Sequence, residues 1–287
     1  MKSAKKIFIA GLLGVFTPFF SYGSSSSTRS ESESPSFSLP ENGNYFSAGE
    51  NGISYTGEKG SWLTLEVGGT ELYSSYLSPL VYRGWSVATQ GVWRRPMRFD
   101  RRWEMEFRGK LELGRGGSPA GNSGMWETQG RFSWGMERIW ETGRWRLGIG
   151  GSVGVTGGVL YLSRNSNNPA AAIAEGNISL TGRAEYRLSL CGRPLILFER
   201  VSIPSASILF SPEYGETYYE IWLGNRRGLV NTGWWGNNFG IDNLLGAEWK
   251  LGERWLVVGW RSELESSWVH SINTRLWRNA AVIGIRF

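Results

Sequence analysis

The stretch WEMEFRGKLEL, residues 103–113, alternates apolar and charged side chains. One parity holds Trp103, Met105, Phe107, Leu111 and Leu113, and the other holds Glu104, Glu106, Arg108, Lys110 and Glu112. Because successive side chains of a β-strand point to opposite faces, this alternation predicts a strand with one apolar face and one face that carries both signs of charge. A helix would spread the same glutamates and leucines around its whole circumference. The stretch therefore predicts a strand that lies between two different environments.

The same alternation returns along most of the chain. It recurs in residues 177–190, around residue 145, in 254–268 and in the last strand, 277–287. Soluble barrels and sandwiches place the apolar side of such strands inside. A transmembrane barrel places apolar and aromatic residues outside, in lipid, and polar residues inside. Periodicity alone does not distinguish these two classes.

The amino-terminal segment indicates secretion. Residues 1–23 form a predicted signal peptide, in which three lysines precede an apolar run at 7–20 and the small-residue site SYG at 21–23. The apolar run is shorter than the roughly 20 residues that a membrane-spanning helix needs, so we expect cleavage rather than anchoring. Residues 24–60 begin with a stretch rich in serine, glutamate and proline, and we interpret them as a flexible periplasmic lead-in.

The remaining chain, residues 61–287, combines many aromatic residues with many glycines. The whole sequence has 16 tryptophans and 40 glycines, and it ends on Phe287 after an alternating stretch. With the signal peptide, these features predict an all-β protein, a transmembrane antiparallel up-and-down β-barrel in the outer membrane of a Gram-negative bacterium. The expected partners are outer-membrane lipid and the barrel assembly machinery, through the C-terminal strand. The net charge is +6, and without the three lysines of the signal peptide it is +3, from 28 basic and 25 acidic residues. These residues are interspersed, which argues against nucleic acid as a partner.

Turn signals predict the number of strands. Short polar breaks that suit periplasmic turns occur at 98–102, 141–144, 191–193, 212–216 and 251–254. Breaks that suit the outer side occur at 73–79, 115–124, 163–169, 202–206, 231–238 and 270–273. Breaks of the two kinds alternate along the chain and predict about twelve strands, with both chain termini in the periplasm.

The charged parity supplies the candidate functional residues, which we expect to line the interior of the barrel. They are Arg102, Glu104, Glu106, Arg108, Lys110, Glu112, Arg183, Glu185, Arg187, Arg261, Glu263 and Glu265, together with Glu127 and Arg131. Two interpretations remain. The charges pair across strands and plug the barrel, because an unpaired buried charge is costly, or they leave a narrow polar path for small solutes. Barrels of eight strands are filled and those of sixteen are open, and we favour the plug.

His270 is the only histidine, and it supports an alternative function. The sequence HSIN, 270–273, resembles the His-x-Ser-Asn motif of outer-membrane lipid A deacylases, with a shorter spacing. On a strand, adjacent residues point to opposite faces, so Ser271 would lie away from the histidine and another serine would have to act as nucleophile. We therefore expect no enzyme, and a lipid-modifying acyl hydrolase is the alternative. With one histidine and the single Cys191, we expect no metal and no cofactor.

Three stretches carry a resemblance to a known family. They are SYLSPLVYRG at 75–84, SPEYGETYYEIWLGNRRG at 211–228 and the terminal VIGIRF. Over roughly 61–287, the chain resembles a family of secreted and outer-membrane Bacteroidetes proteins catalogued as a domain of unknown function. The resemblance implies a phylum and a compartment, but no reaction and no catalytic residues.

Overall fold

The computed structural model describes residues 48–49, 52–53, 60–166, 168–224 and 227–287. The predicted signal peptide and most of the predicted lead-in lie outside these residues. Strands β1 (Ala48–Gly49) and β2 (Gly52–Ile53) pair with each other in an antiparallel arrangement. All the other strands belong to one sheet.

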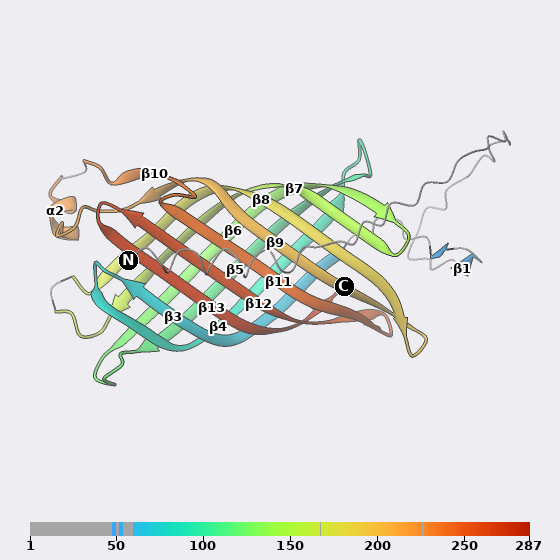
Figure 1. The fold of residues 1–287 in the computed structure, drawn as a ribbon, viewed down its shortest axis with the longest axis horizontal. Helices are drawn as coiled ribbons and strands as arrows, with labels where there is room; N and C mark the ends of the chain where they lie inside the picture. The colour runs from blue at the N-terminus through green and yellow to red at the C-terminus, as the bar shows by residue number, and fades with distance from the viewer. Residues whose placement is uncertain (1–47, 50–51, 54–59, 167, 225–226) are drawn as a thin grey trace, which may run out of the picture. The chain divides into compact units, whose positions relative to one another are not determined.

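Ten strands close this sheet into a barrel (Figure 1). They are β3 (Gly60–Ser74), β4 (Ser78–Pro96), β5 (Trp103–Gly117), β6 (Gly124–Thr142), β7 (Trp145–Leu162), β8 (Ala170–Leu190), β9 (Arg193–Phe210), β11 (Asn238–Leu251), β12 (Arg254–Val269) and β13 (Ile272–Arg286). Each strand pairs antiparallel with its neighbour in the chain, and β13 pairs with β3 to complete the ring. The prediction of an all-β, antiparallel up-and-down barrel is confirmed.

The predicted count of twelve strands is wrong, and the first reason lies in β9. We expected a loop at 202–206, but β9 runs through this stretch and contains Pro204. The pairing with β8 shifts there, because Ser179 lies opposite Pro204 while Ile178 lies opposite Ala206. Such an extra residue is a β-bulge, one of the few places in a sheet that tolerate proline. A sequence that has the composition of a turn is here an irregular strand.

The second reason is the segment that follows β9. Residues 212–216, expected as a short periplasmic turn, belong to a long connection that leads to the short helix α2 (Tyr218–Trp222). Thr217 caps this helix and forms a reciprocal pair of hydrogen bonds with Glu220. Strand β10 (Val230–Trp234) then pairs with the end of β9 and stays outside the ring of ten. In the described part of the chain, no helix has the length and apolar character that a membrane crossing requires.

The two ends of the barrel differ. At one end, here the turn end, short connections join β4 to β5, β6 to β7, β8 to β9 and β11 to β12. The opposite end, the loop end, carries α2 and β10 and lies to the left in Figure 1. Two of the tightest turns have left-handed backbone at both residues, Cys191-Gly192 at the turn end and His270-Ser271 at the loop end. This geometry matches the twist of two-residue hairpins.

The two faces of the wall have opposite chemistry. On β5, Glu104, Glu106 and Glu112 are buried inside the barrel, whereas Leu111 and Leu113 are exposed on its outside. Inside the barrel, one apolar cluster lies toward the loop end and contains Leu72, Leu77, Tyr82, Met125, Leu160, Leu162 and Leu276. Another, smaller cluster contains Trp62, Val92 and Val257. Charged side chains fill the interior between these clusters.

Candidate functional site in the barrel interior

A first group of interior ion pairs centres on Glu263. Its carboxylate lies 2.7 Å from Nζ of Lys110 and 3.2 Å from the guanidinium of Arg131. Arg278 reaches in from β13 and lies 3.0 Å from both Glu112 and Glu265. We call this group the loop-side network, and it comprises Glu66, Lys110, Glu112, Glu127, Arg131, Arg261, Glu263, Glu265 and Arg278.

A second group, the turn-side network, lies nearer the short turns. Arg183 lies 2.7 Å from Glu104 and 3.0 Å from Glu185, and Glu106 is contacted by several arginines. The group comprises Arg94, Glu104, Glu106, Arg108, Glu137, Glu141, Arg146, Arg183, Glu185, Arg187 and Arg200. Asp242 links the two networks, 3.1 Å from Arg108 and 3.5 Å from Arg261. Charged residues from all ten strands of the ring therefore meet in the interior.

The structure places most of the predicted residues inside the barrel. Glu104, Glu106, Lys110, Glu112, Arg183, Glu185, Arg187, Arg261 and Glu263 are buried, and Arg108 and Glu265 are partly buried. Arg102 is wrong as an interior residue, since it lies in the turn before β5 and 67% of its side chain is exposed. There its side chain donates hydrogen bonds to Asp100, which lower the pKa of that carboxyl. The alternation of β5 ends at Trp103, so it does not extend to residue 102.

Other charged members of the networks were not predicted as site residues. They are Glu66, Arg94, Glu137, Glu141, Arg146, Arg200, Asp242 and Arg278. In β4 and β9, the inward positions hold both charged and apolar residues. Charge therefore does not alternate regularly along these strands, and the sequence does not reveal which residues point inward. Arg94, for example, shares its face with Ala88 and Val92. Counting every second residue from Gln90 would have placed Arg94 inside.

An aromatic cluster toward the turn end adds to the closure of the interior. The indole nitrogen of Trp62 donates to Glu248 at 2.6 Å, and Arg286 lies 2.7 Å from the same carboxylate. The guanidinium groups of Arg94 and Arg286 lie 4.5 Å and 5.1 Å from the centre of the Trp62 ring. Trp255 is also buried here, beside Arg286. Cations that stack on desolvated tryptophan are stabilised by the ring, so this cluster is held by both charge and packing.

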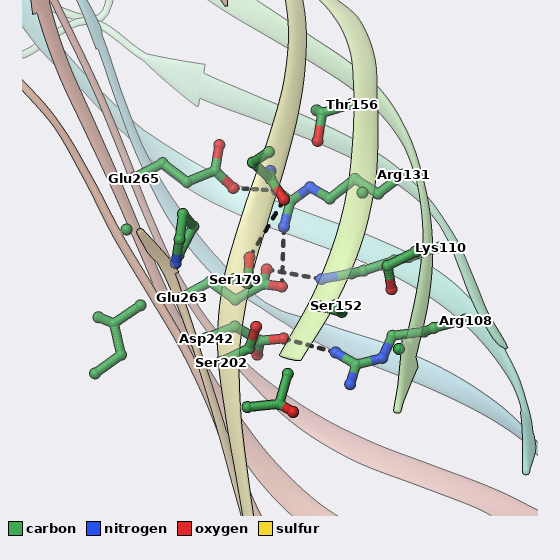
Figure 2. Close-up of a pocket in the computed structure, with 18 of the residues that line it drawn as sticks. Arg108, Lys110, Arg131, Ser152, Thr156, Ser179, Ser202, Asp242, Glu263 and Glu265 are labelled. Carbon is green, nitrogen blue, oxygen red and sulfur yellow. Dashed lines mark hydrogen bonds and ion pairs between the residues drawn. The ribbon is translucent and has the colours of Figure 1, made fainter. Parts of the chain in front are cut away.

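A chamber of ≈ 150 Å³ lies among the two networks (Figure 2). Arg108, Lys110 and Arg131 extend into it from one side and meet Asp242, Glu263 and Glu265 on the other. Small hydroxyl side chains line part of the remaining wall, namely Ser133, Ser152, Thr156, Ser179, Thr181 and Ser202. Apolar residues line another part, among them Phe132, Val155, Ile173, Pro204, Phe239, Ile241 and Leu264. We call it the central chamber. Within the described residues, no group of histidine, cysteine, aspartate or glutamate side chains could hold a metal ion.

A smaller chamber of ≈ 90 Å³ lies toward the loop end. It shares Ile173, Glu175, Asn238 and Glu265 with the central chamber. Tyr76 and Tyr218 line it, and they also hold the connection that carries α2. Tyr76 donates to the backbone carbonyl of Glu216 at 2.7 Å, and the hydroxyl of Tyr218 accepts from the backbone N–H of Ala172 at 2.6 Å. Burial raises the pKa of Tyr218, so both hydroxyls are protonated at neutral pH.

His270 does not form a catalytic arrangement with any serine of the described chain. It occupies the first position of the two-residue turn between β12 and β13, with φ of 48°, and Ser271 follows with φ of 63°. The imidazole lies beside Gly228, and its Nδ1 is buried without a hydrogen-bond partner in the described structure. A nucleophile has to lie within hydrogen-bond reach of its base. The hydrolase alternative is therefore not favoured.

Comparisons with known proteins identify a family and several similar structures. The transport unit of the autotransporter AIDA-I from Escherichia coli is 8% identical, with a TM-score of 0.41, over 79% of this chain and 90% of that chain. The beta domain of the Bordetella autotransporter BrkA is 10% identical, with a TM-score of 0.40, over 80% of this chain and 99% of that chain. The outer membrane protease OmpT from Escherichia coli is 9% identical, with a TM-score of 0.41, over 82% of this chain and 98% of that chain.

A search of curated proteins found no match. A family model matches residues 58–286, which include all ten strands of the barrel. The chain therefore belongs to the family described as Protein of unknown function (DUF3316).

Proposed function

We propose that this chain is an integral outer-membrane protein of a Gram-negative bacterium whose barrel is closed by its own side chains. The observation that carries the proposal is the inverted chemistry of the wall. All ten strands expose a large apolar residue on the outside: Leu63, Trp85, Leu111, Phe132, Ile149, Ile178, Leu197, Leu245, Trp260 and Ile283. Buried ion pairs occupy the inside. Soluble monomers rarely expose apolar patches of more than a few hundred Å².

A bilayer accounts for both faces. In hydrocarbon, every backbone N–H and C=O must be paired within the protein, and a closed ring of strands meets this requirement. The strands are 14 to 21 residues long, which exceeds the roughly 9–11 residues needed to cross a bilayer. Outward tryptophans also occur toward both ends of the wall, for example Trp126 and Trp268 toward the loop end and Trp140 and Trp145 toward the turn end. Aromatic belts of this kind mark the two membrane surfaces.

The interior supports a closed barrel rather than a pore. A chain of ten strands is close to the eight-stranded size at which side chains fill the interior. Here the turn-side network and the cluster at Trp62 occupy the interior toward the turn end, and apolar side chains such as Leu72 and Met125 occupy part of the loop end. The central chamber lies between them. We infer that it is a recess reached from the loop end and that ions do not pass through the barrel.

Cell fractionation and heat-modifiable gel mobility test the membrane assignment. The expected result is recovery in the outer-membrane fraction and a folded form that migrates differently before and after boiling. Recovery as a soluble periplasmic monomer would contradict the proposal. We further propose that the C-terminal strand, which pairs with β3 to close the ring, is the segment that the barrel assembly machinery recognises.

Conductance in planar lipid bilayers tests the closure. We expect no stepwise conductance from the wild-type chain. Replacing Trp62 and Trp255 with alanine removes the aromatic cluster. The space left by the two indoles shortens the barrier between the chamber and the turn end, so a small leak of ions should appear. Replacing the outward Trp140 and Trp145 with alanine provides a matched control, because these residues do not line the interior. Stable open channels in the wild-type chain would show that the barrel is a pore.

A further inference from the structure

We propose that the central chamber binds a small neutral polyol, such as a triol or a monosaccharide, that enters from the loop end. The two chambers share Ile173, Glu175, Asn238 and Glu265, so they adjoin and form one recess toward that end. The inference rests on the proposed function in one respect, because the loop end would face the outside of the cell. The binding chemistry itself depends only on the folded barrel.

Several buried polar atoms of the central chamber have unused hydrogen-bonding capacity. Nε of Arg108, Nε of Arg200 and the hydroxyl of Thr181 are buried and make no hydrogen bond in the described structure. Thr181 and Arg200 are only 6% and 9% exposed. Buried polar groups in proteins nearly always have partners. These atoms have almost no accessible surface, so a molecule that donates and accepts hydrogen bonds would satisfy them only after neighbouring side chains shift, and the same holds for water.

The charges of the chamber favour a neutral ligand. Arg108 lies 3.1 Å from Asp242, Lys110 lies 2.7 Å from Glu263, and Arg200 donates to Glu106 at 2.6 Å. Each of these charges already has a counter-charge, so an ionic ligand would have to displace one of them. A guanidinium has five donors and a carboxylate has about four acceptor positions. Paired groups can therefore still hydrogen-bond to hydroxyls without any change in net charge.

The opposite wall of the chamber is chemically matched to hydroxyl groups. Ser152, Thr156, Ser179 and Ser202 project from β7, β8 and β9, and Figure 2 shows them around the ion pairs. A hydroxyl can donate and accept, and it can rotate to suit its partner. The side-chain amides of Asn177 and Asn238 also line the chamber, and they donate to Glu175 at 3.1 Å and 3.2 Å. Such a mixed wall recognises a ring or chain of alcohols better than it recognises a single charge.

The volume limits the size of the ligand. A cavity of ≈ 150 Å³ equals the size that holds benzene in an engineered apolar core, so it accepts a molecule of about six non-hydrogen atoms. Glycerol has this size. A pyranose would have to extend into the loop-end chamber, which adds ≈ 90 Å³. Ligands this small bind weakly in general, so we expect dissociation constants near the millimolar range, roughly 1 mM.

The test uses the full chain, folded in detergent micelles and checked by heat-modifiable mobility. Saturation-transfer-difference NMR and calorimetric titration are carried out with glycerol and D-glucose as neutral probes. Inorganic phosphate and ethylammonium serve as an anion and a cation of similar size. The expected result is saturable binding of at least one neutral probe and none of either ion. Preferential binding of phosphate or ethylammonium would overturn the proposal.

Matched variants locate the binding in the chamber. Thr181→Val keeps the shape of the side chain but removes its hydroxyl, and we expect about three- to tenfold weaker binding. Ser202→Leu fills the chamber and should abolish binding. Thr70→Val makes the same exchange at another buried threonine, which lines neither chamber, and should bind as the wild-type chain does. Equal weakening by Thr181→Val and Thr70→Val would place the binding elsewhere.

The remaining outcomes separate this inference from the proposed function. An inserted, folded barrel that binds neither glycerol nor glucose would overturn the inference alone and leave water as the occupant of the chamber. A folded barrel that is soluble in cell fractionation but binds a polyol would contradict the membrane assignment and support the inference.

Discussion

The carboxylate of Glu106 lies 2.6 Å from the guanidinium of Arg200, which follows it by 94 positions in the sequence. Glu106 is on β5 and Arg200 is on β9, with β6, β7 and β8 between them around the wall. Arg94 and Arg108 contact the same carboxylate at 3.0 Å and 3.2 Å. One acidic side chain therefore contacts three guanidinium groups and connects strands on different sides of the barrel.

The first prediction concerns removal of this carboxylate. Glu106→Leu and Glu106→Gln each leave the surrounding guanidinium groups without their common counter-charge, and breaking a buried pair from one side costs about 3 to 5 kcal/mol. Urea-dependent folding into lipid vesicles, followed by tryptophan fluorescence, measures the loss. Glu71→Gln is the control, because Glu71 pairs with Arg83, whose side chain is 73% exposed. Exposed pairs contribute about 0 to 1 kcal/mol, so Glu71→Gln should lose little folding free energy. If the Glu106 variants lost no more than Glu71→Gln, the interior of the barrel would be hydrated.

The second prediction tests which face of β5 meets lipid. Phe107 is on the outward parity and packs against Trp93 and Phe132 on neighbouring strands, with ring centres 5.4 Å and 6.2 Å away. Phe107→Arg should destabilise the inserted barrel by about 2 to 4 kcal/mol, because it places a charge in the hydrocarbon region. Phe107→Leu keeps an apolar surface and should have a much smaller effect. If the arginine were tolerated and the leucine were not, a soluble barrel would be the better description.

The faces of the strands could be predicted from the sequence because they depend on a local rule. Alternation in 103–113 assigns Glu104, Glu106 and Glu112 to one face whatever the rest of the chain does. The ion partners could not be predicted in the same way. The alternation does not say that Glu104 meets Arg183, whereas Glu106, two residues later, meets Arg94, Arg108 and Arg200. Barrel closure and register decide which charges meet, and these are non-local properties.

The errors in the strand count have a related cause. Proline, serine and glycine mark turns because of their backbone preferences. At 202–206 the same residues form a bulge, since neighbouring strands hold them in an extended conformation. At 211–228 the family resemblance marked the segment without indicating a helix, and a five-residue helix such as α2 is too short to show helical periodicity.

The third prediction concerns the contact between Tyr76 and the connection that carries α2. Burial raises the pKa of Tyr76 to about 12, and the nearby Tyr218, Glu216 and Glu220 act in the same direction. The raised pKa means that the phenol of Tyr76 stabilises the fold fully below pH 10, and that this stabilisation is lost as the pH rises toward 12. A phenolate absorbance titration should show one late ionisation that is missing in Tyr76→Phe.

The same variant should also loosen the loop end at neutral pH. Tyr76→Phe removes the hydrogen bond to the carbonyl of Glu216 but keeps the ring that packs edge-on against Tyr218. We expect faster protease cleavage within 211–224 and no change in membrane insertion. Unchanged cleavage, together with the loss of an ordinary ionisation near pH 10 instead of a late one, would show that the hydroxyl of Tyr76 is exposed to water.

The last prediction concerns the irregular wall at Pro204. Pairing between β9 and β11 ends at Ser202, and pairing between β9 and β10 begins at Ala206. Proline has no N–H, and between these points the indole of Trp235 donates a hydrogen bond to the carbonyl of Pro204 at 2.6 Å. Trp235→Phe keeps an aromatic side chain but removes this donor. If lipid surrounds the site, no water can replace the bond, and we expect a loss of about 1 to 3 kcal/mol in the vesicle folding titration.

Trp234→Phe is the matched control, because Trp234 is also exposed and its indole donates no hydrogen bond in the described structure. Its effect should stay within about 0.5 kcal/mol. Equal and small effects of the two variants would mean that water reaches the carbonyl of Pro204, and the edge of the hydrocarbon region would then lie closer to the turn end than this bulge.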